Sequence, residues 1–555
     1  MPQPLKIFSH PGPVDQNLMK IRLHQVKLSL GYQEQDIPKI VAQELRCELS
    51  LIKELKVIRR SVDARSRRSA PHFIVSVELD FPAHLLTKNL QKITEIVEEP
   101  KIVIQPRLAS HLVAKRPRPV VVGAGPAGLM AALALAEAGL RPLLIERGAA
   151  APERTEQVAR FWKGDAFNEE SNTLYGEGGA GLFSDGKLTS RSKDRPRVKR
   201  FLEALVRCGA SPSILIDAEP HVGSDVLAEI VPRMRQLIID YGGEVRFNCR
   251  LNQVFIEEGR LQAVQVNDER IETDACVLAT GHSARDVFRM LAFAGVPLEA
   301  KSFAIGVRVE LPQARVDQAQ WHEWAGHPRL GAASFRLTRK EEQDSRSCYS
   351  FCMCPGGMVI ACASSAGQIT TNGMSLSKRD ESYANAAFLV PIRPTDIPVT
   401  GSADPAILDN YKFQEAIEEK AFRLGGGNYA VPASRLQDFL EGRISKDLPP
   451  GRSNQRSVPV DLREILPDFV CATLTSAIPK MLQKMRGVVL NEVILYGAET
   501  RSSSPIRVVR GKDGHSTGVR GLFPTGEGAG YAGGIVSSSI DGLRASEAII
   551  RTYLP

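Results

Sequence analysis

The chain has 555 residues and a formal net charge of +8, with 43% apolar, 24% charged and 6% aromatic residues. This composition excludes a disordered or fibrous chain, and the length predicts about three domains of ~150 residues each. The N-terminus holds no apolar stretch of signal-peptide length, and Gly and Pro interrupt the best membrane candidate at 120–140. We therefore expect a cytoplasmic protein without a membrane span, and the nine cysteines fit reduced thiols better than a disulfide framework.

Residues 1–114 read as a small accessory domain with an excess of basic residues. Apolar alternation and helical periodicity predict strands at 26–30, 55–61, 73–81 and 101–105 and helices at 37–49 and 86–97, the first helix capped by Asp36. The alternation at 73–81 is the strongest strand signal in the chain. The resulting order, βαββαβ, is the ferredoxin-like plan.

A basic run within this domain raises the question of a nucleic-acid partner. It comprises Arg59, Arg60, Arg65, Arg67 and Arg68. Such a run can contact phosphates, but it more often lies in a solvated loop. The strand at 73–81 also lacks the aromatic pattern with which related RNA-recognition sheets stack bases. We expect a docking or regulatory module, followed by a linker at 115–119.

A glycine-rich turn after this linker carries the functional argument. Three valines at 120–122 predict a buried strand, and an Ala-rich helix follows the G-x-G-x-x-G pattern. The first glycine permits a tight turn, the second a close approach to pyrophosphate, and the third close packing of the helix. The turn comprises Gly123, Ala124, Gly125, Pro126, Ala127 and Gly128. An ordinary Gly-rich turn is the alternative, but the complete strand, turn and helix favour a dinucleotide site.

The next strand supports the same interpretation. It ends in Glu146, followed by Arg147, and Glu146 lies 23 residues after Gly123. This is close to the ~20-residue spacing of the acid that binds a ribose hydroxyl in such sites. The spacing predicts an unphosphorylated ribose but does not separate FAD from NAD.

Resemblance to known flavoproteins separates the two. GAGPAG with LLIERG, DACVLATGHSARD at 274–286 and GLFPTGEGAGYAGG at 521–534 resemble the FAD-binding segments of the superfamily that includes glutathione reductase and fumarate reductase. Further segments, among them NTLYGEGGAGLFSDGKLTSR at 172–191 and ETRSSSPIR at 499–507, resemble a bacterial family of FAD-dependent dehydrogenases of unknown substrate, over nearly the whole chain.

This resemblance implies an α/β fold with FAD as the cofactor. We expect a Rossmann-like FAD-binding domain at 115–300 and 483–555, built from a parallel sheet and a β-meander, with an inserted α+β substrate domain at 301–482. The meander is predicted at 244–249, 253–258 and 260–266. The C-terminal segments imply further FAD contacts from Thr280, Gly281, Gly526, Glu527, Gly528, Gly533, Gly534 and Ile535. Glu527 stands where many members have Asp, which leaves its role open.

The segment at 172–191 resembles a loop that wraps FAD near its pyrophosphate and ring. A turn-rich surface loop is the alternative. The residues expected to contact FAD are Gly178, Gly179, Gly181, Ser184, Asp185, Gly186 and Lys187.

Catalytic residues are harder to predict, because a flavin performs the electron transfer itself. His282 is a candidate acid or base, and Arg501 with Ser504 is a candidate grip for an anionic substrate. Each has a structural alternative. His221 and Arg308 are weaker candidates of the same kind.

A group of cysteines is a further candidate. Cys348, Cys352 and Cys354 have a C-x3-C-x-C spacing that matches no common metal site, and Cys362 follows the next strand-like run. Alternation would put the first three on one strand face. Inert thiols and a flavin-coupled redox pair that includes Cys354 are both compatible with this pattern, and no metal site is predicted.

Together these features predict an FAD-dependent oxidoreductase, a dehydrogenase or reductase that exchanges two electrons with a small, anionic substrate. No second G-x-G-x-x-G lies between 200 and 465, so NAD(P)H would act as a transient electron donor without a domain of its own. Two alternatives stay open: an RNA-directed flavoprotein that uses its basic N-terminal domain, and a non-catalytic FAD-binding scaffold.

Overall fold

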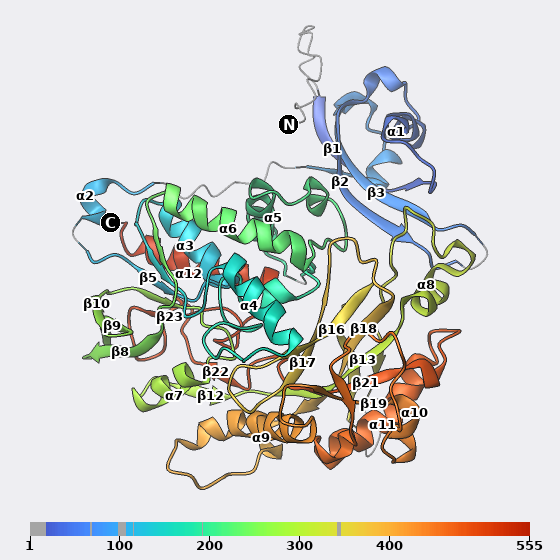
Figure 1. Ribbon diagram of the computed structural model, residues 1–555. Helices are drawn as coiled ribbons and strands as arrows, with labels where there is room; N and C mark the ends of the chain where they lie inside the picture. The colour runs from blue at the N-terminus through green and yellow to red at the C-terminus, as the bar shows by residue number, and fades with distance from the viewer. Residues whose placement is uncertain are drawn as a thin grey trace. The chain divides into compact units, whose positions relative to one another are not determined.

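The computed structural model describes residues 18–66, 69–97, 107–114, 116–190, 192–340 and 346–554 (Figure 1). These residues form two units. The first unit comprises Met1–Ile102 together with the short segment Leu215–Ala218. The second unit comprises Val103–Ile214 and Glu219–Pro555. Within the described ranges, no helix combines the length and apolar character needed to cross a membrane.

The N-terminal unit is a four-stranded antiparallel sheet with strand order β2-β3-β1-β4. Its elements are β1 (Leu18–Leu28), α1 (Ile37–Leu45), β2 (Lys53–Asp63), β3 (His72–Pro82) and β4 (Thr94–Ile96). The five alternating apolar residues of β3 are all buried, which confirms the predicted alternation: Phe73, Val75, Val77, Leu79 and Phe81. Asp36 precedes α1 as expected, but its carboxylate accepts from the Gln33 amide (2.9 Å) instead of capping that helix.

The second helix predicted for this unit, at 86–97, is wrong. Residues Ala83–Leu85 and Leu90–Lys92 form short 3-10 turns, and β4 follows directly. The hydroxyl of Thr87 accepts from the Leu90 amide (3.4 Å), and the hydroxyl of Thr94 donates to the Leu90 carbonyl (2.8 Å). Such local side-chain bonds compete with helical bonding. The strand predicted at 101–105 lies outside the described residues.

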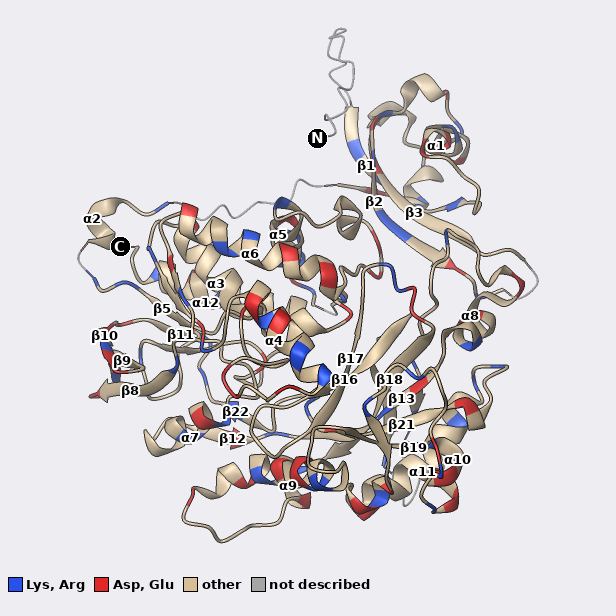
Figure 2. Ribbon diagram, viewed as in Figure 1, with Lys and Arg blue, Asp and Glu red and all other residues tan. Residues whose placement is uncertain are grey.

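Two of the three described arginines of the basic run are paired with acids, and the third, Arg59, is exposed. Arg60 donates to Asp217 (2.9 Å), and Arg65 donates to Asp63 (2.9 Å). Figure 2 shows Lys and Arg in blue along the strands of this unit. Arg67 and Arg68 lie outside the described residues. These pairs resemble an ordinary solvated, ion-paired surface more than a free phosphate-binding one.

The second unit is organised around a five-stranded parallel sheet with order β23-β11-β5-β6-β7. Its strands are β5 (Val120–Val122), β6 (Leu143–Ile145), β7 (Glu244–Arg246), β11 (Cys276–Leu278) and β23 (Leu522–Pro524). This architecture confirms the predicted Rossmann-like part of the fold. The carboxyl ends of β5, β11 and β23 lie side by side, which is where such sheets bind ligands.

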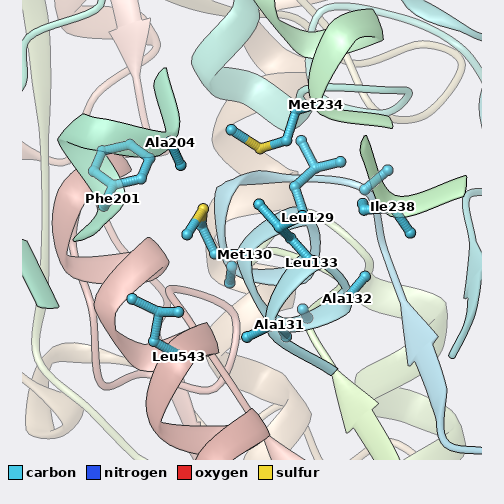
Figure 3. Close-up of a cluster of buried hydrophobic side chains, with 14 of the residues drawn as sticks. Leu129, Met130, Ala131, Ala132, Leu133, Phe201, Ala204, Met234, Ile238 and Leu543 are labelled. Carbon is cyan, nitrogen blue, oxygen red and sulfur yellow. The ribbon is translucent and has the colours of Figure 1, made fainter. Parts of the chain in front are cut away.

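Helices cover this sheet and form its core. The central helix, α3 (Pro126–Glu137), is almost entirely buried, and α12 (Ile535–Arg551) packs against it. A Cβ on Gly542 of α12 would stand 2.0 Å from the Ala127 carbonyl, so the two helices touch through backbone. Figure 3 shows α3 side chains meeting Phe201, Met234 and Leu543. The other helices of this part are α2 (Ser110–Val113), α4 (Ala151–Lys163), α5 (Arg195–Arg207), α6 (Ser224–Asp240) and α7 (Arg285–Phe293).

The predicted three-stranded meander is present, but it begins one strand later in the chain than predicted. It consists of β8 (Leu251–Glu257), β9 (Arg260–Val266) and β10 (Glu269–Glu272). The segment expected as its first strand, 244–249, instead supplies β7, the edge strand of the parallel sheet. A strand of three residues has too short an apolar pattern to predict which strand it pairs with. In the structure, β7 packs against α6 and pairs with β6 at the edge of the parallel sheet.

The remaining sheet is mixed and has seven strands in the order β14-β15-β18-β13-β21-β19-β20. These are β13 (Phe303–Pro312), β14 (Thr338–Arg339), β15 (Cys348–Cys354), β18 (Tyr383–Ile392), β19 (Val431–Arg435), β20 (Ser457–Pro459) and β21 (Ile494–Glu499). Two antiparallel strand pairs accompany it: β16 (Gly357–Cys362) pairs with β17 (Thr370–Ser375), and β12 (Leu298–Ala300) pairs with the distant β22 (Ile506–Val508). Its helices are α8 (Gln313–Trp321), α9 (Asp409–Leu424), α10 (Leu436–Glu441) and α11 (Asp468–Leu482).

Candidate functional site

The glycine turn between β5 and α3 forms a cradle that admits no side chains at two positions. Gly123 has φ +99°, and a Cβ there would stand 2.5 Å from the Ala279 carbonyl oxygen. A Cβ on Gly128 would stand 1.8 Å from the Gly123 carbonyl oxygen. Gly125 precedes α3, and no described side chain caps this helix. The first amides of α3 therefore face the turn with the positive end of the helix dipole behind them.

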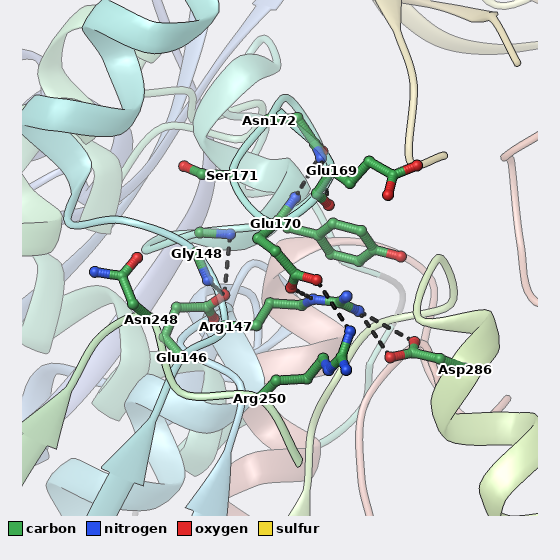
Figure 4. Close-up of polar contacts among 12 residues, drawn as sticks. Glu146, Arg147, Gly148, Glu169, Glu170, Ser171, Asn172, Asn248, Arg250 and Asp286 are labelled. Atoms are coloured by element: carbon green, nitrogen blue, oxygen red, sulfur yellow. Dashed lines mark hydrogen bonds and ion pairs between the residues drawn. The ribbon is translucent and has the colours of Figure 1, made fainter. Parts of the chain in front are cut away.

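Glu146 is buried at the end of β6 and binds three backbone amides. Its carboxylate accepts from Ala124 (2.8 Å), Gly148 (3.0 Å) and Gly176 (3.0 Å), and Figure 4 shows it beneath Gly148. A carboxylate offers about four acceptor positions, so one stays open for a hydroxyl. The side chain thus fixes three loops around the cradle and can still serve a ribose.

Arg147 connects loops rather than pointing freely outward. Its guanidinium donates to Glu170 (2.7 Å) and Asp286 (3.1 Å) and lies 4.4 Å from the centroid of the Tyr175 ring (Figure 4). Burial disfavours its charge, but these two acids raise the pKa of Arg147 above its usual range. The residue expected to contact the cofactor therefore also holds the loop at 168–176 against the start of α7.

The second glycine-rich segment, 172–187, packs against the first. A Cβ on Gly179 would stand 3.1 Å from the Gly125 Cα, and one on Gly181 would stand 3.2 Å from Ile535 of α12. Gly178 has φ +88° and its amide donates to the Ala124 carbonyl (2.9 Å). The predicted neighbourhood of the two segments is therefore present in the fold.

Arg154, which was not predicted from the sequence, binds this segment through backbone carbonyl groups. The side chain is fully buried and donates to four backbone carbonyls, those of Asn172 (2.8 Å), Gly176 (3.2 Å), Glu177 (2.7 Å) and Gly179 (2.8 Å). Burial lowers the pKa of Arg154 to about 10. Among the described residues no acceptor is found for its Nη2 atom. An Arg in an amphipathic helix gives no sequence signal for such a role.

The polar residues of the segment are engaged with protein groups. The Ser184 hydroxyl donates to the Gly181 carbonyl (2.7 Å), Asp185 accepts from Arg379 (2.9 Å), and the Lys187 ammonium donates to the Met353 carbonyl. Gly186 has φ +66°, and a Cβ there would stand 2.8 Å from the Gly223 amide nitrogen. Lys187 thus ties the loop to β15 and Asp185 ties it to the turn after β17, while Gly186 packs against the turn before α6.

The C-terminal segment closes the cradle from the side of β23. A Cβ on Gly528 would stand 2.4 Å from the Gly281 carbonyl oxygen, so this segment touches the backbone that leaves β11 through Thr280. The Gly526 amide donates to Asp541 (2.7 Å), a second residue that the sequence reasoning missed. Arg510 donates to the same carboxylate (2.7 Å). Gly533 and Gly534 lead into α12; the N-cap residue Gly534 has no side chain to cap the helix, and its amide donates to the Glu527 carboxylate.

Glu527 and His282 lie beside each other in this region. The Nε2 atom of His282 is 3.9 Å from a carboxylate oxygen of Glu527. Burial, with Arg501, Arg285 and Lys301 nearby, lowers the pKa of His282 to about 3, so the imidazole is neutral at pH 7 and this contact is no ion pair. Burial raises the pKa of Glu527 to about 7.

The two candidates in the segment after β21 are held by other side chains. Arg501 forms a bidentate pair with Glu418 of α9 (2.8 and 2.7 Å), and no acceptor is found among the described residues for its Nη1 atom. Arg285 reaches the same carboxylate at 3.3 Å. Ser504 is buried, and its hydroxyl donates to the Ile506 carbonyl (2.6 Å), as expected for a turn residue.

The cysteines do not share one face as expected. A β-bulge between Phe351 and Cys354 interrupts the alternation, and Cys352 adopts φ +40° within it. Cys348 and Cys354 are therefore buried while Cys352 is exposed. Burial raises the pKa of Cys354 to about 11. No group of three metal-ligating side chains occurs in the part of the chain that the structure describes.

The two weaker candidates are structural in their contacts. Arg308 is fully buried and paired with Glu499 (2.6 Å), and it also donates to the Cys352 carbonyl (2.8 Å). His221 bonds to the Ser377 carbonyl (3.0 Å), and burial lowers its pKa.

The residues present fit a flavin dinucleotide. A turn that is open at the side-chain position of Gly125, the uncapped N-terminus of α3 and a buried acid with one open acceptor position are features that such a ligand needs. They come from the carboxyl edge of neighbouring parallel strands.

Three protein families match parts of the chain. Residues 117–305 match Pyridine nucleotide-disulphide oxidoreductase, residues 302–502 match FAD-dependent protein, C-terminal domain-like, and residues 20–80 match a domain of unknown function. An uncharacterized protein of Clostridium beijerinckii is 40% identical over 544 residues, which cover 96% of this chain and 99% of that protein.

The similarity to solved structures is lower. The glycerol-3-phosphate dehydrogenase from Bacillus halodurans complexed with FAD is 11% identical, with a TM-score of 0.33 over 80% of this chain and 66% of that one. L-proline dehydrogenase from P. horikoshii is 13% identical, with a TM-score of 0.31 over 79% of this chain and 94% of that one. Similarity at this level carries no information about the substrate.

Proposed function

The chain belongs to a bacterial family of FAD-dependent proteins with a pyridine nucleotide-disulphide oxidoreductase domain, and we propose that it is an FAD-dependent oxidoreductase acting on a small anionic substrate. The observation that carries the proposal is the turn from Gly123 to Gly128: it leads into the uncapped start of α3, and a Cβ at Gly125 would meet only the Gly179 Cα, at 3.8 Å. Glu146 at the end of the next strand supports the same ligand. The bound flavin would exchange two electrons, as a dehydrogenase or reductase.

The protein's own groups would bind and orient the cofactor. In this proposal the amides of α3 hold the pyrophosphate, Glu146 accepts a ribose hydroxyl, and the start of α12 directs its positive end toward the part of the ring that becomes negative on reduction. Arg154 and Asp541 would act as positioning residues, because each holds a loop of the cradle through backbone groups.

An anionic substrate is supported by unused donors on two arginines, although Arg285 also pairs with Glu415 (3.0 Å). Arg501 and Arg285 both contact Glu418, and each retains a guanidinium nitrogen for which no acceptor is found in the described residues. Buried donors without acceptors are unfavourable, and an oxyanion would satisfy them. NAD(P)H is proposed as a transient donor, and a cytoplasmic location is retained as part of the proposal.

The domain division at 114, 300 and 482 is retained as a proposal, with the N-terminal unit as a variant of the ferredoxin-like plan. Its strand order supports this plan, although the second helix is absent from the described residues. The RNA-directed alternative stays a prediction, and the pairing of Arg60 and Arg65 with aspartates does not favour it.

The test is spectroscopic. Purified protein is expected to be yellow, to release FAD on denaturation, and to lose its flavin absorbance when titrated with dithionite without oxygen. Reoxidation by a panel of small carboxylates then identifies the substrate class. A folded protein that neither carries nor takes up FAD would sink the proposal, and a flavin that dithionite cannot reduce would leave only the scaffold alternative.

A further inference from the structure

Glu527 is a partly buried acid without a strong cationic partner at the edge where the cofactor is expected. Its side chain is 25% exposed and accepts from the backbone amide of Gly534, at the start of α12. His282 is 3.9 Å away, too far for a direct hydrogen bond, so a water or ligand group is needed to join them. The Nδ1 atom of His282 has no partner among the described residues.

The two side chains are held in this position by backbone contacts. They leave the carboxyl ends of the adjacent parallel strands β11 and β23, and the Thr525 amide donates to the Leu278 carbonyl (2.9 Å). The close approach of Gly528 to Gly281 then brings Glu527 beside His282. The next strand of the sheet, β5, carries the glycine cradle. The pair therefore lies at the ligand-binding edge and not in the core.

The charges around the pair come from several elements. Lys301, which follows β12, favours the ionised form of Glu527, while burial opposes it more strongly. Arg501, Arg285 and Lys301 keep His282 neutral, with Glu418 acting weakly in the opposite direction. Burial and, to a lesser extent, Arg507 lower the pKa of Lys301 itself, and under Gly526 the side chains of Arg510 and Asp541 form an ion pair.

We propose that the carboxyl of Glu527, which lies beside the imidazole of His282 at the ligand-binding edge of the sheet, takes up a proton when the bound flavin accepts two electrons. The inference rests on the proposed function. The balance is two electrons and one proton at the flavin, plus one proton from solvent at a carboxylate oxygen of Glu527. Negative charge added next to a buried carboxylate favours its neutral form. With a pKa of about 7 before reduction, Glu527 is half protonated at neutral pH and can respond to this charge.

The experiment measures the midpoint potential of the flavin in the full-length holoprotein as a function of pH. For a two-electron couple a tenfold change in proton concentration shifts the potential by about 30 mV per proton taken up. Above pH 7 the unchanged protein is therefore expected to show a slope steeper by about 30 mV per pH unit than Glu527→Gln. Glu272→Gln, at an exposed position of β10, is the matched control and should keep the steeper slope.

A second readout covers the case in which Glu527→Gln binds no flavin. Proton uptake on photochemical reduction of the unchanged protein, followed with an indicator dye at pH 8, should exceed one proton per two electrons, and Glu527→Asp should retain the excess. Equal slopes in all variants, or uptake of only one proton, would overturn this inference while leaving the proposed function intact. Absence of a reducible flavin would overturn the proposed function instead.

Discussion

The substitution Gly125→Ala separates the binding of a dinucleotide from the stability of the fold. A Cβ at Gly125 would meet only the Gly179 Cα, at 3.8 Å, which is ordinary contact, and the backbone φ of −77° suits alanine. The apoprotein should therefore unfold within about 0.5 kcal/mol of the unchanged protein. The methyl group would nevertheless occupy the place where a pyrophosphate must approach the amides of α3.

The loss of one charge-assisted hydrogen bond from these amides costs about 1.5–3 kcal/mol. This corresponds to a rise in the Kd for FAD of roughly 10- to 150-fold. The Kd is measured by titrating apoprotein with FAD and following the quenching of flavin fluorescence, with unfolding of each apoprotein recorded in urea. Gly31→Ala, where nothing lies within 4 Å, is the control and should change neither quantity.

Gly128→Ala provides the contrasting case. Its Cβ would stand 1.8 Å from the Gly123 carbonyl oxygen, so the turn or α3 must move in the protein itself. Overpacking of this kind costs about 1–3 kcal/mol of stability.

If Gly125→Ala binds FAD as tightly as the unchanged protein does, the turn between β5 and α3 does not hold the pyrophosphate.

Three further outcomes are expected. Arg154→Met should destabilise the apoprotein by at least about 3 kcal/mol, because four carbonyls lose a charged donor. Urea unfolding measures this loss. The control, Arg160→Met at an exposed position of the same helix, should have little effect. Two arginines hold the pKa of Glu418 at about 2 despite its burial, so the stability it contributes, on the order of 3 kcal/mol, is present above pH 4.5 and lost as the pH falls toward 2. Glu418→Gln should remove this pH dependence, and identical acid unfolding curves would contradict the assignment. N-Ethylmaleimide should label exposed Cys352 before buried Cys354, faster as the pH rises from 7 to 9, and mass spectrometry showing equal labelling would contradict the bulge geometry.

Sequence alone determined the parts of this protein that depend on neighbouring residues. The valines before Gly123, the spacing of the glycines and the acid at the end of the next strand predicted the cradle, because each acts through local backbone conformation or packing of a strand on its own helix. The alternation of β3 likewise predicted its buried face. Where local signals conflicted, as between Thr87 and Thr94, the predicted helix did not form.

Tertiary structure alone decided which distant groups meet. Asp185 binds Arg379, Arg501 binds Glu418, and the short strand at 244–246 joins the parallel sheet instead of the meander. No local sequence pattern shows which of several oppositely charged side chains will form an ion pair, or which of several short strands will pair. Their choice follows from the order of strands in the sheets, which brings together residues more than eighty positions apart, and burial then makes each pairing obligatory.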